Sequence, residues 1–384
     1  MENDQETPVV DSRVKNLPEP AVDAGADSDE EPAGEDEKYE QDDDDFLVDF
    51  PDETEDLELV HLRIGLLDNL RLPRFAKHLK RLCLRQNVIT HLDPEIFHPL
   101  ANLEELDLYD NKVKHLGDAL DNLSNLQTLD LSFNLFKTIP ERLEFVKQVE
   151  TIYFVQNRIS KISGLSPLTK LRSLELGGNR IRKIENLEEL VNLEELWLGK
   201  NKISKIEVSE MKREINSVLA DDIKGLSTLK KLRILSMQSN RITKLEGVEG
   251  LESLEELYLS HNGIKKLEGL DNNLQLTTLD VGNNFIEVLE NVSHLKTFAE
   301  LWVGSPQFCI TDYESLILSK MNHNLIPDLR ALDTQLRSIA SLETLYLEGN
   351  PCQTTDMANY RRKVKLALPQ LKQIDATYAY FQSS

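Results

Sequence analysis

The sequence has few cysteines, few aromatic residues and no long apolar run. Its three cysteines, Cys83, Cys309 and Cys352, lie far apart in a chain of 384 residues, which fits a reducing compartment and predicts no disulfide framework. No apolar run reaches the length that crosses a bilayer, and the first ten residues, MENDQETPVV, are too polar for a secretory signal peptide. We therefore expect neither a membrane span nor secretory targeting.

Motifs for catalysis and for small ligands are also lacking. The eight histidines have no metal-ligand spacing with one another or with the cysteines, and no phosphate-binding glycine loop occurs. The adjacent glycines of LGGNRI fill positions of a repeated pattern. Since no nucleophile can be paired with a base, we expect a protein that is not an enzyme and that carries no cofactor and no metal.

Positive charge is scarce in residues 1–57, which contain 23 Asp and Glu and 3 Lys and Arg. Their net charge is −20, and the whole chain carries −23, which leaves −3 for residues 58–384. The segment has too little apolar surface to offset the entropy of ordering, so it predicts a disordered acidic tail. Two interpretations stay open, a solubilising tail and an attractor for a basic partner. The weakly charged remainder disfavours nucleic acid as a partner.

What the chain does have is a repeat. The pattern L-x-x-L-x-L-x-x-N-x-I recurs ten times, for example as LKRLCLRQNVI, LEELWLGKNKI and LETLYLEGNPC. Its asparagines recur every 22 to 24 residues within the regular runs, a register that no helical period of 3.5 or 3.6 residues would hold. This is the leucine-rich-repeat signature. Two degenerate copies starting at Leu59 and Phe298 bring the expected number of turns to about twelve.

Each position of the pattern has a physical reason. In x-x-L-x-L-x-x the leucines alternate with other residues, as in a strand with one buried face. One turn cannot bury its own leucines, so turns must stack into a continuous core with a parallel sheet on the concave face. The asparagine can satisfy backbone groups of two turns, which makes it structural. The fold class is therefore an α/β leucine-rich-repeat solenoid over 58–350.

A cap is expected over 351–384, because the last turn would otherwise expose its leucines. Pro369 can end a helix there. We interpret Tyr360, Arg361 and Arg362 as cap surface and not as a basic site. The stretch YRRKVKLALPQL offers four apolar residues to cover the last turn, Val364, Leu366, Leu368 and Leu371.

Side chains opposite the leucine core form an unusual column at the x of L-x-L. Five of its eleven residues are aromatic and four are acidic, although aromatics make up 6% of the chain. A neighbouring column, two residues earlier, contains Glu105, Glu195, Glu256 and Glu300. The column itself consists of Cys83, Asp107, Asp130, Tyr153, Glu175, Trp197, Ser236, Tyr258, Asp280, Trp302 and Tyr346.

Strands about 4.8 Å apart would align this column into an exposed stripe roughly 50 Å long. Aromatic side chains anchor protein partners, and carboxylates select basic ones. We therefore predict a protein-binding face. The alternative, that aromatics merely suit strands and the column is solvated, stays open.

The repeat period is interrupted twice. The asparagine spacing jumps once to 39 residues, and removing 208–224 restores an unbroken turn. The copy from Phe298 predicts a ladder asparagine where Pro306 stands, and the expected residue appears at Asn324, which makes about 18 residues, 304–321, extra. Each insert is either an excursion from the stack or a retained short intron, and both interpretations stay open.

Together, LWLGKNKISKIE, LRILSMQSNRITKLEG, LEELYLSHNGI and the ending YRRKVKLALPQLKQIDATYAYF resemble the leucine-rich-repeat regulatory subunits of type-1 protein phosphatase, the regulatory subunit 7 family. The resemblance covers most of residues 58–381 apart from the inserts. It implies that the concave face binds the phosphatase catalytic subunit. Tyr153 and Trp197 stand where the family more often has phenylalanine. The implied partner-binding residues are Asp130, Tyr153, Glu175, Trp197, Asp280, Glu300, Trp302 and Tyr346.

The resemblance also implies a complex with a small inhibitor protein, a location in nucleus and cytoplasm, and roles in phosphatase maturation and mitotic chromosome segregation. By itself the protein is expected to be a monomer. A second hypothesis is a structural adaptor for a cytoskeletal or axonemal partner, because repeats of this length also occur in such proteins. An enzyme is the least favoured reading.

Overall fold

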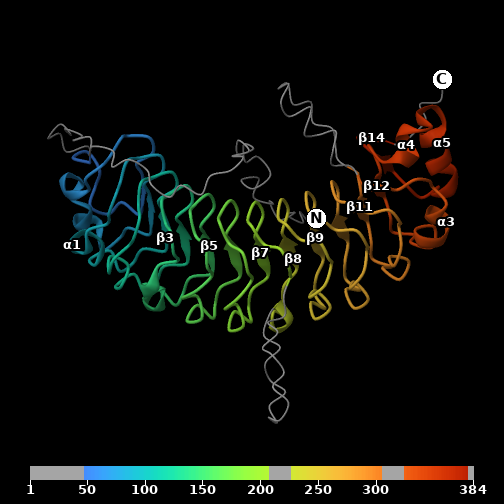
Figure 1. Ribbon diagram of the computed structural model, residues 1–384. Coiled ribbons are helices and arrows are strands. Elements are labelled where there is room, and N and C mark those ends of the chain that lie inside the picture. Colours follow the sequence, from blue (N-terminus) through green and yellow to red (C-terminus); the bar gives the residue numbers. More distant parts are fainter. Residues whose placement is uncertain (1–46, 207–225, 305–323, 379–384) are drawn as a thin grey trace, which may run out of the picture. The chain divides into compact units, whose positions relative to one another are not determined.

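The described residues form one sheet of fourteen strands in chain order, in which β1 to β13 are parallel and β14 is antiparallel to β13 (Figure 1). The computed structural model describes residues 47–206, 226–304 and 324–378. The parallel-sheet solenoid predicted from the repeats is confirmed. Its strands are β1 (Asp56–Glu58), β2 (Arg81–Cys83), β3 (Glu105–Asp107), β4 (Thr128–Asp130), β5 (Thr151–Tyr153), β6 (Ser173–Glu175), β7 (Glu195–Trp197), β8 (Ile234–Ser236), β9 (Glu256–Tyr258), β10 (Thr278–Asp280), β11 (Glu300–Trp302) and β12 (Thr344–Tyr346).

The leucines of the pattern form one core that runs through all the turns. The central residue of each strand points inward, and Leu82, Leu196 and Leu301 have no exposed surface. Because a strand alternates its side chains, the residues flanking each central leucine lie on the opposite side of the sheet. We call that opposite side the sheet face.

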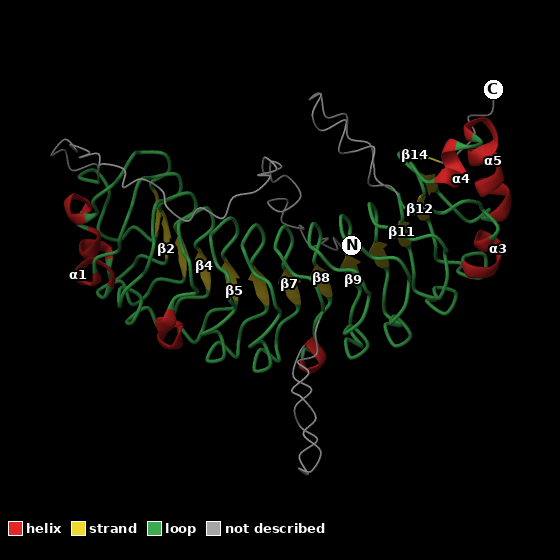
Figure 2. Ribbon diagram, viewed as in Figure 1, coloured by secondary structure: helices red, strands yellow, loops and turns green. Residues whose placement is uncertain are grey.

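Segments between the strands contain turns and short helices, with little α-helix. Figure 2 places short helices on the outer side of the curve and longer ones at its C-terminal end. A turn of 22 residues leaves too few residues beyond the strand and the asparagine bend for a long helix. Within 47–206 and 226–304 the helices are α1 (Pro94–Phe97), η1 (Asp68–Leu70), η2 (Leu72–Phe75), η3 (Glu141–Phe145) and η4 (Leu226–Thr228). No helix in the described part of the chain is long and apolar enough to cross a membrane.

The repeated asparagines form a ladder that joins consecutive turns. The Asn134 amide nitrogen donates to the carbonyls of Leu108 (2.9 Å), Leu131 (3.2 Å) and Ser132 (3.1 Å). Its oxygen accepts the N–H of Val113, on the preceding turn, at 2.9 Å. One buried side chain therefore satisfies backbone groups of two turns, as the sequence predicted.

The beginning of the fold differs from the prediction. The first strand is β1, with Leu57 and Leu59 buried, whereas Leu62 is 45% exposed. The degenerate copy therefore starts five residues before Leu59. Leu47 is also fully buried in the core, so the boundary at residue 57 was placed too late. The acidic residues Asp56 and Glu58 concealed the strand because they point away from the core.

The stack continues across both interruptions. β7 pairs directly with β8, and β11 pairs with β12. Asn324 takes the predicted ladder position, since its nitrogen donates to Val281 O at 2.8 Å and its oxygen accepts from Ile286 N at 2.8 Å. The insert 208–224, and the insert 304–321 except for Gly304, lie outside the described residues, so the choice between excursion and retained intron stays open.

The C-terminal cap covers the last turn, as expected. Val364, Leu368 and Leu371 are buried, but Leu366 is 70% exposed and does not contribute. Tyr360, expected on the cap surface, is instead buried as part of the hydrophobic core. The cap elements are α4 (Pro351–Thr354), α5 (Met357–Ala367), β13 (Gln373–Ile374) and β14 (Thr377–Tyr378), and α3 (Ala331–Gln335) belongs to the last turn, before β12.

Asp375 holds the cap to the last turn. Its Oδ1 accepts the N–H groups of Leu347 (2.9 Å) and Glu348 (3.0 Å), and Tyr360 donates its hydroxyl to the same oxygen at 3.3 Å. Burial nevertheless raises the pKa of the Asp375 carboxyl above its ordinary value. The cap therefore contains a carboxyl group whose charged form is partly disfavoured.

We predict that Asn134→Ala lowers the free energy of unfolding by about 3 kcal/mol, because several buried backbone groups lose their partner. Urea denaturation measures the loss. The control is Asn125→Ala, whose exposed side chain donates one bond to Ala101 O and should change stability by less than about 1 kcal/mol. Equal effects of the two variants would contradict a ladder role.

We also predict that wild-type stability, relative to Asp375→Asn, declines as pH rises. When folding raises the pKa of a carboxyl group, the protonated group stabilises the folded state relative to the ionised one. This stabilisation is fully present below the pKa of the unfolded chain, about 3.9, and is lost as pH rises through the pKa of the folded state. Asparagine keeps an acceptor oxygen but cannot ionise. Urea unfolding of both proteins at pH 4, 5.5 and 7 gives the difference, and a difference independent of pH would rule the effect out.

Candidate functional site: the aromatic and acidic column of the sheet face

The predicted column is aligned on the sheet face. Each of its eleven members is the last residue of a strand, and neighbouring strands pair these residues directly. Trp197 pairs with Ser236 and Ser236 with Tyr258, while Trp302 pairs with Asp280 and Tyr346. The partner-binding residues predicted from the resemblance therefore all lie on one face, Glu300 in the neighbouring column.

Four of the aromatic residues form two pairs. The rings of Trp302 and Tyr346, on adjacent strands, have centroids 4.8 Å apart. The rings of Trp197 and Tyr258 stack at 6.2 Å across the strand between them, where Ser236 is small enough to lie beneath both. Trp197 therefore packs against Tyr258 and is half-buried, so the predicted stripe is less exposed at this position than expected.

Acidic members of the column are much less exposed than predicted. The exposed fractions of Asp130, Glu175 and Asp280 are 3, 5 and 7%. Asp130 accepts the N–H of Ser132 at 2.9 Å, and Asp280 accepts from Gly282 N and Gln238 Nε2, both at 3.0 Å. Asp130 and Asp280 each accept a backbone N–H two residues further along the chain, so they stabilise the bend after the strand in addition to charging the face.

Carboxylates of the neighbouring column are more accessible and hold the aromatics. Trp302 Nε1 donates to Glu300 Oε2 at 3.2 Å, and the Tyr258 hydroxyl donates to Glu256 Oε2 at 2.5 Å. Glu300, Glu256 and Glu195 are half-buried. In contrast, burial raises the pKa of Asp280 even though Ser260, Gly282 and Gln238 donate to it. The charge available to a partner therefore comes mainly from Glu195, Glu256 and Glu300.

An ion pair and an aromatic pair that the sequence did not reveal lie at the N-terminal third of the face. Arg85 Nη1 lies 2.9 Å from Asp107 Oδ2 and 3.7 Å from Asp130 Oδ2. Its guanidinium carbon lies 4.0 Å from the ring centroid of Tyr109, which packs against Phe133 at 4.8 Å. Arg85 and Tyr109 lie two residues after the column members Cys83 and Asp107. Continuing the alternation of the strands by two residues would therefore have predicted both side chains on this face.

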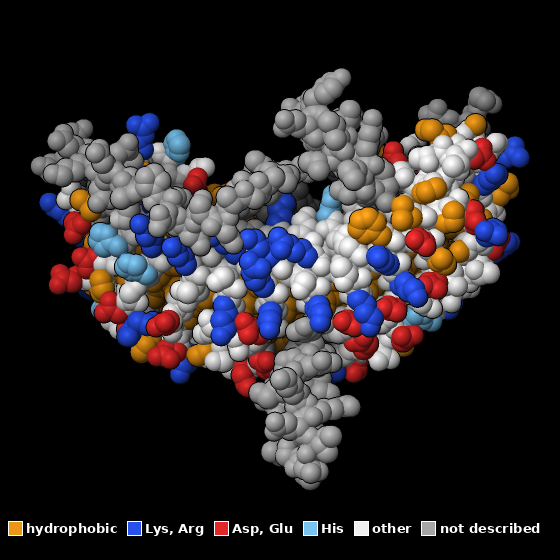
Figure 3. Space-filling model, viewed as in Figure 1, with side chains coloured by type: hydrophobic (Ala, Val, Ile, Leu, Met, Phe, Trp, Pro, Cys, Tyr) orange, Lys and Arg blue, Asp and Glu red, His pale blue; other side chains and the backbone are white. Residues whose placement is uncertain are grey.

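Basic residues gather on another side of the turns. The position after the ladder asparagine is basic on successive turns at Arg158, Arg180, Lys202 and Arg241, and each of these residues donates its backbone N–H to the turn before. Figure 3 shows Lys and Arg side chains gathered over the middle turns in view. The net charge did not indicate this basic cluster, because acidic residues elsewhere in the chain offset its positive charge.

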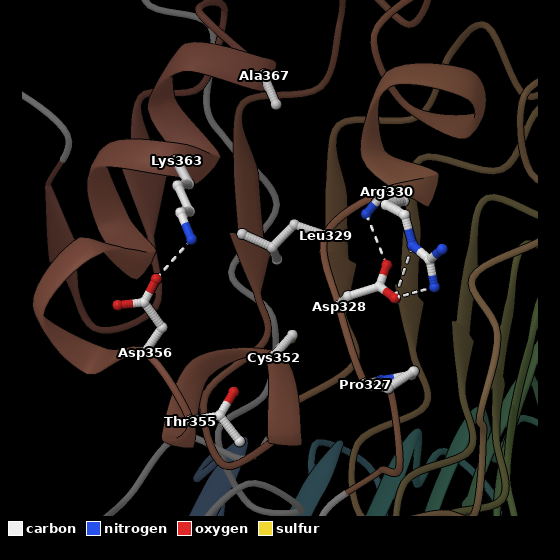
Figure 4. A pocket seen from close by; sticks show the side chains of 9 residues that line it. All are labelled: Pro327, Asp328, Leu329, Arg330, Cys352, Thr355, Asp356, Lys363 and Ala367. Carbon is white, nitrogen blue, oxygen red and sulfur yellow. Dashed lines mark hydrogen bonds and ion pairs between the residues drawn. The ribbon is translucent and has the colours of Figure 1, made fainter.

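A cleft between the last turn and the cap has a volume of about 410 Å³ (Figure 4). The ion pairs Asp328–Arg330 and Asp356–Lys363 flank it. Burial raises the pKa of the Cys352 thiol to about 12, so this sulfur stays protonated and is a poor nucleophile. His, Cys, Asp and Glu within 47–206, 226–304 and 324–378 form no group of three that could hold a metal ion.

Comparison with known proteins agrees with this geometry. A family model described as "Leucine rich repeat" matches residues 77–136, and one described as "Leucine Rich repeats (2 copies)" matches 147–189, 169–210 and 252–297. The fold is a leucine-rich-repeat solenoid. Among solved structures, an internalin from Listeria monocytogenes has a TM-score of 0.61 at 24% identity, covering 84% of this chain and 87% of that one. This likeness concerns the fold alone.

Curated relatives of this leucine-rich-repeat chain are phosphatase regulators. Protein phosphatase 1 regulatory subunit SDS22 of Saccharomyces cerevisiae is 44% identical over 82 residues, 21% of this chain and 24% of that protein. Protein phosphatase 1 regulatory subunit 7 of Mus musculus is 57% identical over 47 residues, 12% of each. These matches confirm the resemblance seen in the motifs. They span at most about a quarter of the relatives' length, and the relatives are named regulatory subunits and not enzymes.

We predict that Asp130→Ala lowers the free energy of unfolding by about 2 kcal/mol, because the buried Ser132 N–H loses its acceptor. Glu195→Ala should change it by less than about 1 kcal/mol, since Glu195 accepts a single 3.2 Å bond from Ser173 at the surface. Chemical denaturation distinguishes the two. Equal stability losses would mean that the buried aspartate has no special structural role.

Proposed function

We propose that this leucine-rich-repeat protein is a non-catalytic regulatory subunit that binds the catalytic subunit of a type-1 Ser/Thr protein phosphatase through its sheet face. The observation that carries the proposal is the aligned column of paired aromatics and carboxylates. The kinship with named phosphatase regulatory subunits supplies the partner. The proposed contacts are Asp130, Tyr153, Glu175, Trp197, Asp280, Glu300, Trp302 and Tyr346.

Contacts on this face divide by physical role. Trp302 and Tyr346 form a packed aromatic anchor at one end, and Trp197 with Tyr258 forms another near the middle. Buried aromatic anchors dominate the affinity of many protein interfaces. The accessible Glu300 adds negative charge that favours a basic partner surface and speeds encounter.

The finer parts of the proposal follow from kinship. We propose that binding controls the maturation, location and mitotic activity of the phosphatase, in nucleus and cytoplasm, and that a small inhibitor protein joins the complex. By itself the chain would be monomeric. A structural adaptor for another protein is the alternative, because the curated matches span a small part of the relatives and the fold alone names no partner.

The test is calorimetric binding of the full chain to a type-1 phosphatase catalytic subunit. We predict that Glu300→Ala/Trp302→Ala abolishes binding, since anchors of this kind cost about 2 kcal/mol or more each on truncation. Because Trp302 donates a hydrogen bond to Glu300, the double variant removes donor and acceptor together and leaves neither group unpaired. Circular dichroism and thermal melting should match the wild type.

A matched control is Glu144→Ala/Phe145→Ala, an acidic and aromatic pair on η3, where Phe145 is 40% exposed. This variant should bind as the wild type does. If the wild-type chain does not bind the phosphatase at all, the regulatory-subunit proposal is wrong and the adaptor is favoured. If both double variants weaken binding equally, the contact is not on the sheet face.

A further inference from the structure

Two rows of residues follow the ladder asparagines along one side of the turns. The first row is the residue directly after each asparagine, and the second row lies three residues further along the chain. From Arg158 to Leu325, each backbone N–H of the first row donates to the preceding turn at 2.7 to 2.8 Å, so consecutive members lie side by side. We call the two rows the asparagine ridge, which consists of Arg158, Arg180, Lys202, Arg241, Gly263, Phe285 and Leu325 in the first row and Lys161, Lys183, Lys205, Lys244, Lys266, Val288 and Asp328 in the second.

Over its first five turns the ridge presents positive charge to solvent. Every second-row member on these turns is an exposed lysine. Within the part of the chain that the structure describes, Lys183, Arg241 and Lys266 form no ion pair. By contrast, Arg172 and Arg233, which precede their strands, form ion pairs of 3.0 and 2.7 Å with glutamates of the next turn. The charge of the three ridge residues is therefore available to a partner.

Both rows change from basic to apolar on the turn of Asn284. Phe285, Val288 and Leu325 are 43, 54 and 44% exposed. Leu325 donates its N–H to Ile286 O at 2.7 Å, which places it beside Phe285 on the neighbouring turn. Figure 3 shows hydrophobic side chains at the surface on the C-terminal side of the basic ones. Single exposed apolar residues are ordinary, whereas adjacent ones beside a charged surface are typical of an interaction site.

An acidic row limits the width of what can bind. On four of the turns, a glutamate stands two residues beyond the second row of the ridge. These residues are Glu185, Glu246, Glu268 and Glu290. A broad polyanion such as duplex DNA would meet these carboxylates, whereas a narrow acidic segment confined to the ridge would not. Phosphate groups would also gain nothing from the apolar turns, so the ridge fits an acidic protein segment that has apolar residues at one end.

The length of the ridge sets the length of that segment. Seven turns at a strand spacing of about 4.8 Å extend over roughly 30 Å. An extended chain rises about 3.3 Å per residue, so about nine residues cover the ridge.

We propose that the asparagine ridge is a docking site for an extended acidic segment of another protein. The carboxylates of the segment lie over Lys183, Arg241 and Lys266, and its apolar end packs on Phe285 and Leu325. Electrostatic attraction speeds the encounter, and the apolar end adds affinity that salt does not screen. The ridge shares no residue with the contacts proposed for the phosphatase, so this inference goes beyond the proposed function.

Fluorescence anisotropy of the full chain with a labelled octaglutamate peptide that ends in Phe-Leu tests the site. We predict that Lys183→Ala/Arg241→Ala/Lys266→Ala raises the dissociation constant about 10-fold or more. Phe285→Ser/Leu325→Ser should raise it about 5-fold or more, because the apolar contact is lost. Added salt should weaken wild-type binding, since exposed charges are screened.

Matched controls carry the same kinds of substitution away from the ridge. Lys77→Ala/Lys147→Ala/Arg362→Ala removes three exposed basic side chains. Phe145→Ser/Leu366→Ser removes two apolar side chains that are 40 and 70% exposed. Neither control should change the affinity for the peptide, and melting temperatures should match the wild type. Equal weakening by ridge and control variants, or no binding of the peptide to the wild type, would overturn the proposal.

Other occupants of the ridge are distinguished by two measurements. Single-stranded DNA of equal charge should bind more weakly than the peptide; equally tight binding that Phe285→Ser/Leu325→Ser leaves unchanged would assign the ridge to nucleic acid instead. Sedimentation velocity should show no self-association that the triple alanine variant abolishes. Such self-association would assign the ridge to a second copy of the chain and contradict the proposal.

Calorimetry with the phosphatase catalytic subunit separates this inference from the proposed function. The triple alanine variant of the ridge should bind the catalytic subunit as the wild type does. If it does not, the ridge belongs to the phosphatase interface, and a separate docking site is ruled out. If the wild type binds the peptide but not the phosphatase, the proposed function fails and the docking site is supported.

Discussion

The asparagine ladder is the constraint on which the rest of the molecule depends. A turn of 22 residues has to bend sharply after three strand residues, which leaves carbonyls and N–H groups facing inward. The buried side chain of Asn134, bonded to Leu108, Leu131, Ser132 and Val113, satisfies groups that water cannot reach. Since the same bonds tie each turn to the one before, the ladder fixes the distance and the register between turns.

A fixed register between strands aligns the equivalent residues of successive turns into one continuous surface. A slip of one residue would exchange core and surface positions on a strand. With register fixed, Trp302 must lie beside Tyr346, and Trp197 must lie two strands from Tyr258. The face is therefore preorganised. A partner that docks there meets side chains already packed against one another, and the entropy lost on binding is reduced.

Much of this could be read from the sequence, because a repeat of this length leaves few alternatives. The strands, the ladder including Asn324, the aligned column and the cap were predicted. The start was misplaced because Asp56 and Glu58 made β1 resemble an acidic tail. Side-chain directions across strands were not predicted, since contacts such as Arg85 with Asp107 or Trp197 with Tyr258 depend on neighbours 22 or more residues away.

The buried aspartates show why a binding face of this kind is difficult to interpret by mutation. Asp130 and Asp280 lie in the column where a partner would dock, but they also accept backbone N–H groups at the bend after their strands. Mutating such a carboxylate would therefore change both the stability of the fold and the affinity for a partner. Glu300 and Trp302 differ, because they bond each other at the surface. A contact can therefore be assigned to a partner only at positions whose own turn does not need the side chain.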